Sequence, residues 1–193
     1  MFLVKDDYLP LIREDKLNQI TQDSDPLLTK ALPASQEEAA GYIRHRYDND
    51  KVFKSVTEVT TDTVPAAAVD DRFYQSTSQF HYVAIADGGT DLADTNSFTQ
   101  SDSRNPKLVE VLVDIVLYNI HSRINPKSVP TQRKIRYDGD DPEQRGGAIG
   151  WLKNVQKGSI TPDLPVITDE DGETPQNTES VAYGTSSNTA YGY

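Results

Sequence analysis

The stretch RNPKLVEVLVDIVLYNIHSRINPKSVPTQRKIRYDGDD, residues 104–141, decides the fold of this chain. It begins with a helix, which Asn105 can cap and for which Pro106 suits the first position, where a missing N–H costs nothing. Two adjacent faces of this helix are apolar, formed by Leu108, Leu112 and Ile115 and by Val109, Val113, Val116 and Ile120. The stripe left to face water consists of Glu110, Asp114, Tyr118 and His121. Such a helix is typical of a core or a subunit interface. Its apolar run is too short to span a membrane, and Asp114 interrupts it.

A basic segment follows this helix, in a chain whose net charge is −11. Pro126 and Pro130 predict that the segment is a loop. Its cations are Arg123, Lys127, Arg133, Lys134 and Arg136, and the first acidic residue after them is Asp138. We hypothesise that these cations meet carboxylates on a neighbouring subunit or ring. The alternative is a solvated loop that balances the acidic end of the same chain.

Length and composition set broad limits on the class of protein. A chain of 193 residues with 36% hydrophobic residues has room for one ordinary domain with extended parts. It has no cysteine, which excludes disulfides and fits a reducing compartment. The first ten residues contain no long apolar run, so no secretory signal is expected. The acidic balance argues against nucleic acid or an anionic membrane as the main partner.

Residues 1–61 are predicted to supply the first helices of a bundle. Asp25 and Pro26 resemble the N-cap and first residue of a short helical turn. Ser35 and Glu38 form a capping box, which predicts the start of a separate helix that runs to about Tyr47.

Residues 62–103 are predicted to form an inserted, polar β-hairpin arm. Residues 80–86 give a strand signal, residues 87–89 supply turn chemistry, and residues 96–99 are suited to the returning strand. The segment contains too few apolar residues to suggest a core of its own. The alternative is a disordered surface loop.

Residues 104–158 are predicted to complete the bundle with the long central helix, the basic loop and a short helix. The short helix contains Trp151 and is predicted to run from Gly147 to about Gln156, with Gly158 as its C-terminal stop. The expected fold class is therefore mainly α: a small helical bundle with an inserted β-hairpin arm and an extended C-terminal tail.

Residues 159–193 form an acidic tail whose composition is typical of disorder unless it is docked. We expect residues 163–193 to act as a clamp that forms on assembly, by adding a strand to a sheet edge. The candidate anchors are Val166, Ile167, Val181, Tyr183, Tyr191 and Tyr193. Truncation after Lys157 is accordingly expected to cost the folded domain little stability.

The sequence contains no recognisable enzyme motif. The three histidines lack paired-ligand spacing and are interpreted as surface or interface residues: His45, His81 and His121. The glycine pairs 88–89 and 146–147 lack a following Lys-Ser/Thr, so neither is a phosphate-binding loop, and the second is interpreted as a helix entry. The acidic clusters 87–94 and 138–141 do not match the calcium-loop pattern. We therefore expect no catalytic site, no cofactor and no bound metal.

Four segments taken in order resemble a known family. They are EEAAGYIRHRY (37–47), NPKLVEVLVDIVLYNI (105–120), the loop RINPKSVP..RKIRYD (123–138) and AIGWLKNVQKGSITPDLP (148–165), with a short acidic-capped helix before the first segment and a polar insertion after it. Together they are similar to the small head-to-tail adaptor proteins of tailed bacteriophages, and look closest to the branch found in Mu-like prophages and phages of Bacteroidetes. The resemblance covers roughly residues 1–165.

The resemblance implies a structural virion protein. Such adaptors form a ring of about twelve copies beneath the portal, with the portal protein and the next neck or tail ring protein as partners. The protein would lie at the head–tail junction after assembly in the host bacterial cytoplasm. Genome DNA would pass through the ring without tight binding, because an acidic chain disfavours phosphate contacts.

This sequence departs from the family pattern in two places. These are the insertion at 72–103 and the tail beyond Pro165, which leave the layer of the ring open. The alternative function is a non-viral or other phage interaction module, such as a neck, stopper or tail completion protein, without catalytic activity.

Overall fold

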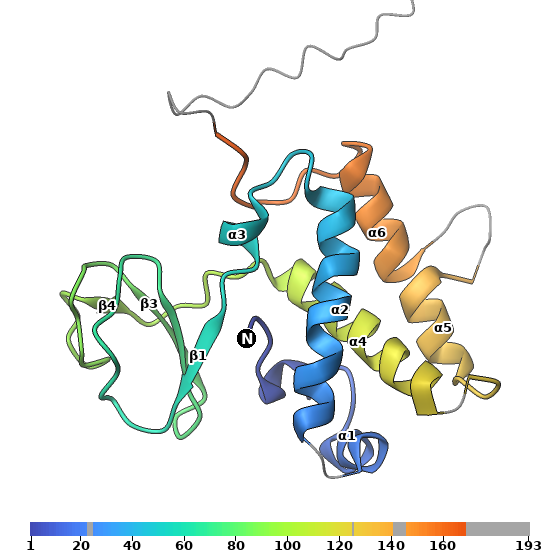
Figure 1. The fold of residues 1–193 in the computed structure, drawn as a ribbon, viewed down its shortest axis with the longest axis horizontal. Helices are drawn as coiled ribbons and strands as arrows, with labels where there is room; N and C mark the ends of the chain where they lie inside the picture. Colours follow the sequence, from blue (N-terminus) through green and yellow to red (C-terminus); the bar gives the residue numbers. More distant parts are fainter. Residues whose placement is uncertain (23–24, 125, 141–145, 169–193) are drawn as a thin grey trace, which may run out of the picture.

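The computed structural model describes residues 1–22, 25–124, 126–140 and 146–168. A 3-10 helix, η1 (Lys5–Tyr8), precedes the helices α1 (Glu14–Thr21), α2 (Asp25–Ile43) and α3 (Asn49–Val52). Four strands follow, β1 (Val56–Val59), β2 (Arg72–Gln75), β3 (Phe80–Ala84) and β4 (Phe98–Thr99). The described chain then forms α4 (Pro106–Ile124), α5 (Thr131–Asp138) and α6 (Gly147–Gln156). Figure 1 shows the helices gathered on one side and the sheet on the other.

Helix α4 is the centre of the helical part, as its sequence predicts. It packs against η1, α1, α2, α5 and α6, and Leu108, Leu112 and Ile115 are fully buried. The Leu108 N–H donates to the Asn105 side-chain oxygen at 3.1 Å, which confirms the predicted cap. The apolar faces of this helix therefore determine where the other helices lie.

Helix α6 also has the predicted bounds. Gly146 is its N-cap residue, and Gly158 has a φ of 75°, a left-handed conformation that suits glycine. The N–H groups of Gly158 and Ser159 donate to the Val155 and Asn154 carbonyls at 3.0 and 2.9 Å. The interpretation of Gly158 as a helix stop is confirmed.

Helix α2 corrects the prediction of two separate helical segments. It is continuous through Pro33, and Ser35 lies inside it. The Ser35 hydroxyl donates to the Ala31 carbonyl at 3.1 Å and accepts from the Asn119 side chain at 3.2 Å, so it does not cap a helix start. Burial on both sides of the proline explains the continuity, because one unbroken helix places these residues together in the core: Leu28, Leu32, Ala39 and Ile43.

The prediction of a mainly α protein with a hairpin arm was wrong. The described residues form six α-helices and a four-stranded mixed sheet, which is a small α/β fold. The strand order is β1-β2-β3-β4; β1 pairs with β2 in parallel, and the other pairs are antiparallel. The β3–β4 hairpin has a clear sequence signal. The strands β1 and β2 do not, because each has four residues and their pairing joins residues distant in sequence.

The sheet also has a small core of its own, which the composition of the segment did not suggest. Its buried residues are Val64, Ala67, Phe73, Ala84, Leu92 and Phe98. The rings of Phe73 and Phe98 meet edge to face, with centroids 5.7 Å apart. Residues 62–103 are therefore neither a polar arm nor a loop without regular structure.

Candidate functional site

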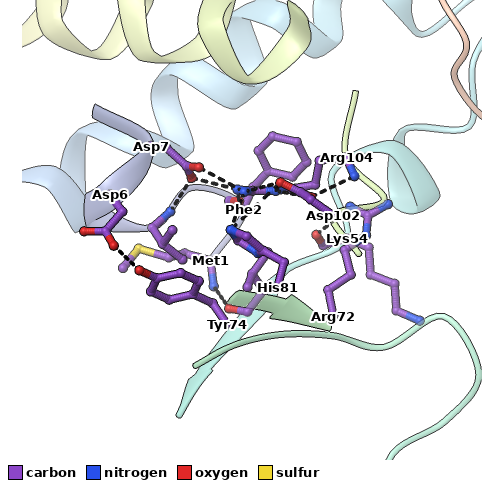
Figure 2. Close-up of polar contacts among 12 residues, drawn as sticks. Met1, Phe2, Asp6, Asp7, Lys54, Arg72, Tyr74, His81, Asp102 and Arg104 are labelled. Atoms are coloured by element: carbon purple, nitrogen blue, oxygen red, sulfur yellow. Dashed lines mark hydrogen bonds and ion pairs between the residues drawn. The ribbon is translucent and has the colours of Figure 1, made fainter. Parts of the chain in front are cut away.

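A buried charge network lies where the helices meet the sheet, and Figure 2 shows its members. At its centre is Arg104, which precedes α4 and is 4% exposed. The guanidinium donates to both carboxylate oxygens of Asp7 at 2.7 and 2.9 Å, to Asp102 at 2.8 and 2.9 Å, and to the Phe2 carbonyl at 2.8 Å. One side chain thus ties the N-terminal segment, the end of the sheet insertion and the start of α4 together.

The two carboxylates of this network are held in place by the backbone. Asp7 also accepts from the Val4 N–H at 2.7 Å, which closes the turn before η1, and Asp102 accepts from the Arg104 N–H at 3.0 Å. Burial alone would raise the pKa of Asp102, but the hydrogen bonds and charge of Arg104 outweigh it and lower that pKa. Both acids are therefore fixed as acceptors for the arginine.

His81 on β3 completes the network from the side of the sheet. Its Nε2 lies 3.0 Å from Arg104 Nη2, and because a guanidinium offers only donors, Nε2 must accept and the ring must be neutral. Burial, and then the charge of Arg104, lower the pKa of His81 accordingly. The ring lies 4.8 Å from that of Tyr74, whose hydroxyl donates to Asp6. His81 therefore acts here as a hydrogen-bond acceptor between sheet and helices.

Arg72 on β2 makes a second link between the sheet and the helices. It donates to the carbonyls of Lys51, Val52 and Lys54, at the end of α3, at 3.2 to 3.3 Å. Its Nε donates to the Ser103 hydroxyl at 3.0 Å. These bonds satisfy carbonyls that a helix end leaves unpaired. The network as a whole is a structural joint between the sheet and the helices. No motif in the sequence predicts it, because its members are far apart along the chain.

The basic segment after α4 is largely helical, which corrects the predicted loop. Helix α5 carries Arg133 and Arg136, and both side chains contact other parts of the same chain. Arg136 donates to Asp114 at 2.7 Å and to Glu110 at 3.3 Å, and Arg133 donates to the Leu11 carbonyl at 3.0 Å. Two of the five predicted interface cations therefore have partners within the same chain.

The same contacts cover part of the polar stripe of α4, although the Glu110 side chain stays 39% exposed. Asp114 is 5% exposed, and the Tyr118 ring stacks on that of Tyr137 with centroids 3.9 Å apart. Burial raises the pKa of Asp114, and the hydrogen bond from Arg136 offsets this only in part. Helix α5 covers this part of the stripe because its Arg136 and Tyr137 match the acidic and aromatic residues there.

Replacing Arg136 with alanine is expected to lower the free energy of unfolding by about 1–3 kcal/mol, because it leaves the buried Asp114 carboxylate without its main donor. The cost stays below that of a fully buried pair, since Arg136 is partly exposed. Chemical denaturation measures the effect. Lys134→Ala is the matched control, because Lys134 is exposed on the same helix. An Arg136→Ala protein as stable as Lys134→Ala would contradict this account.

The remaining predicted cations lie at the surface. Arg123, Lys127 and Lys134 are exposed and form no ion pair with the other described residues. They are the members of the basic segment that can reach a neighbouring molecule. The interface hypothesis for this segment stays a prediction, and it is best tested at these three positions.

The beginning of the tail docks on its own chain. The Asp48 N–H donates to the Pro165 carbonyl at 2.9 Å, and the Ile167 N–H donates to the Arg46 carbonyl at 3.2 Å, so Val166 forms an antiparallel bridge with Tyr47. Leu164 is buried in the helical core. The tail as far as residue 168 is thus part of the protomer. The prediction that residues 163–193 lie outside the protomer's fold was therefore wrong for residues 163–168. The other predicted anchors lie outside the described residues: Val181, Tyr183, Tyr191 and Tyr193.

Three open grooves of about 500 Å³ mark the surface of the helical part. One of about 530 Å³ lies between α2 and α3, where Arg44 and Phe53 line it. A second of about 510 Å³ lies beside α1 and the end of α4, where Lys16 and Ile124 line it. The third, of about 490 Å³, is formed by α4, α5 and α6, with Trp151 in its wall. These three hollows, formed by described residues, are candidate binding surfaces.

The described residues contain no group of three or more His, Cys, Asp or Glu side chains placed to hold a metal ion. The three histidines lie in different environments: His45 is exposed, His81 belongs to the buried joint, and His121 lines the groove beside α1. No helix in the described part of the chain has the length and apolar character needed to cross a membrane.

Compared with known proteins, the chain matches no family model, no curated protein and no solved structure.

Proposed function

We propose that this chain is a structural virion protein of a tailed bacteriophage, a head-to-tail adaptor that forms a ring beneath the portal. Its partners would be further copies of itself, the portal protein and the next neck or tail ring protein. The ring would link the DNA-filled head to the tail and let the genome pass. The protein would be assembled in the bacterial cytoplasm and carried in the virion, and it would have no catalytic role.

One observation carries this proposal: the four segments on which the phage resemblance rests share a single core. Ala39, Ile43 and Tyr47 from the first segment pack in the same cluster as α4, α6 and Leu164. Tyr137, from the third segment, packs against that cluster. The insertion at 72–103, by which the chain departs from the family pattern, supplies three of the four strands of the sheet, and the sheet lies to one side of this unit (Figure 1). The segments therefore behave as one building block with an insertion, as an adaptor of this kind would require.

The charge of the chain supports the same proposal. A net charge of −11 disfavours phosphate contacts, so DNA could pass through a lumen of this composition without being held. We expect no duplex binding by the purified protein at physiological salt.

Deleting the gene from the phage that encodes it is expected to leave DNA-filled heads and free tails, with infectious particles reduced by about three orders of magnitude or more, because a missing ring breaks a mandatory link. Electron microscopy of lysates and plaque counts measure this. Expression of the intact chain from a plasmid should restore joined particles. Normal particles from the deletion strain would reject the adaptor function and favour the alternative, an interaction module outside the head–tail junction.

A further inference from the structure

The seam between the sheet and the helices contains little apolar packing. Among the described residues, the core of the helices and the core of the sheet share no member. The cluster that joins the two parts consists of Val4, Val56 and Tyr74. A cavity of about 130 Å³ lies beside Val4 at the same seam. Polar contacts therefore supply a large share of the energy that holds the sheet against the helices.

His81 is a titratable group at the centre of these polar contacts (Figure 2). Its side chain is 17% exposed. Its Nε2 accepts from Arg104 Nη2 at 3.0 Å, a contact that the ring can make only while Nε2 carries no proton. A proton on Nε2 would replace this hydrogen bond with two cationic donors at the same short distance. The joint is therefore complete in one protonation state of His81.

Several charged or titratable groups belong to the elements that surround the ring. They are Asp6 and Asp7 on η1, Arg72 and Tyr74 on β2, Asp102 after β4, and Arg104 before α4.

The acids among these groups favour a protonated ring, but each of them already accepts from another donor. Asp7 and Asp102 accept from Arg104, and Asp6 accepts from the Tyr74 hydroxyl. Burial, and then the charge of Arg104, outweigh the acids and lower the pKa of His81. The closed joint therefore favours the neutral ring.

The lowered pKa gives the joint a defined pH dependence. When the sheet separates from the helices, His81 becomes exposed and regains the pKa of an ordinary histidine, about 6.5. The open form therefore binds a proton more tightly than the closed form. The closed joint has its full stability above about pH 6.5, and it loses stability as the pH falls from there toward the lower pKa of the closed form.

We propose that His81 is an acid-sensitive switch: its protonation in mild acid raises the population of a form in which the sheet is separated from the helices while the helical core stays folded. The described residues of the helical core come from no strand, so this core can persist without the sheet. The open form exposes Val4, Val56 and Tyr74 to water. The switch is a property of the fold and does not depend on the adaptor function.

Hydrogen exchange of the full-length chain between about pH 7.5 and 5.5 tests the switch. Two amides report the seam: the Val4 N–H donates to the Asp7 carboxylate, and the Val56 N–H donates to the Met1 carbonyl, both at 2.7 Å. The amide of Leu112, in the middle of α4, reports the helical core. Exchange rates corrected for the intrinsic effect of pH give the opening constant at each amide.

His81→Gln is the test variant, because a glutamine side-chain oxygen can accept from Arg104 but does not titrate in this range. His45→Gln and His121→Gln are the matched controls. His45 is exposed, and His121 lies on α4 beside the groove near α1. Burial, and then the charge of Arg133, lower the pKa of His121 too, so its control separates an effect on the helices from one on the seam. Circular dichroism at each pH checks that every variant is folded.

We expect the opening constants at the seam to rise with acid in the wild type and in both controls. Relative to His81→Gln, the rise from about pH 7.5 to 5.5 should be at least about threefold and at most about tenfold, because one proton is gained on opening. Burial also lowers the pKa of the Met1 amine, and this contribution cancels in the comparison because every variant retains it. At each pH the seam should open at least about tenfold more often than Leu112.

An independent measurement on the wild type needs no variant to be stable. The His81 ring proton in the NMR spectrum should titrate below the ordinary histidine pKa of about 6.5. Titration at or above that value would overturn the inference. So would equal pH dependence at the seam in the wild type and His81→Gln, or seam amides that open only together with Leu112. None of these results bears on whether the chain joins heads to tails, which the deletion strain tests.

Discussion

Replacing Arg104 with methionine is expected to lower the free energy of unfolding by about 3–5 kcal/mol. The guanidinium is buried, and its removal would leave the Asp7 carboxylate, 10% exposed, without its charged partner. Asp102 and His81 would lose donors at the same time. Urea denaturation followed by circular dichroism measures the loss.

The loss should fall first on the sheet, because Arg104 joins the sheet to the helices. Trp151 on α6 is the single tryptophan of the chain, so its fluorescence reports the helical part. Hydrogen exchange at β2 and β3 reports the sheet, and we expect those amides to lose protection before the tryptophan signal changes.

Arg13→Ala is the matched control for the Arg104 variant. It removes the same charge, but the Arg13 side chain is 84% exposed and pairs with Asp15 at the surface. An exposed pair is worth up to about 1 kcal/mol. If Arg104→Met cost no more than Arg13→Ala, the network in Figure 2 would not be the joint that we describe.

Truncation after Lys157 is expected to destabilise the protein by about 3–5 kcal/mol, whereas truncation after Thr168 should change its stability little. The shorter chain loses Leu164, which is 9% exposed, and Ile160, which packs against the same core. Burial of one large aliphatic side chain is worth about 1.5–3 kcal/mol. The two main-chain bonds to Arg46 and Asp48 add about 1 kcal/mol each, and the conformational entropy of ordering the segment offsets part of the total. This reverses the expectation drawn from composition, that a cut after Lys157 is harmless.

Thermal unfolding of the two truncated chains beside the full-length protein provides the measurement. Two point variants separate the contributions within the docked segment. Leu164→Ala should cost about 2–4 kcal/mol through lost packing, and Val166→Ala should cost under about 1 kcal/mol because Val166 is 41% exposed. Equal melting temperatures for the two truncations would show that residues 158–168 do not belong to the protomer's fold.

The sequence by itself determined the elements whose signals are local. The cap at Asn105, the two apolar faces of α4 and the stop at Gly158 each depend on residues within a few positions of one another. Capping bonds and helical periodicity act over one or two turns, so a linear pattern is enough to predict them. The strand signal of β3 and the turn residues 87–89 are predictable for the same reason, because each depends on adjacent residues.

The tertiary structure decided everything that depends on distant pairs. Helix α2 continues through Pro33 because its residues on both sides are buried by other helices, and β1 becomes a strand because β2 lies beside it. The joint brings Asp7 to Arg104 across 97 positions, and Arg136 reaches Asp114 across 22. Arg136 and Asp114 appear free in the linear pattern but pair in the folded chain, because burial makes an unpaired charge too costly to keep.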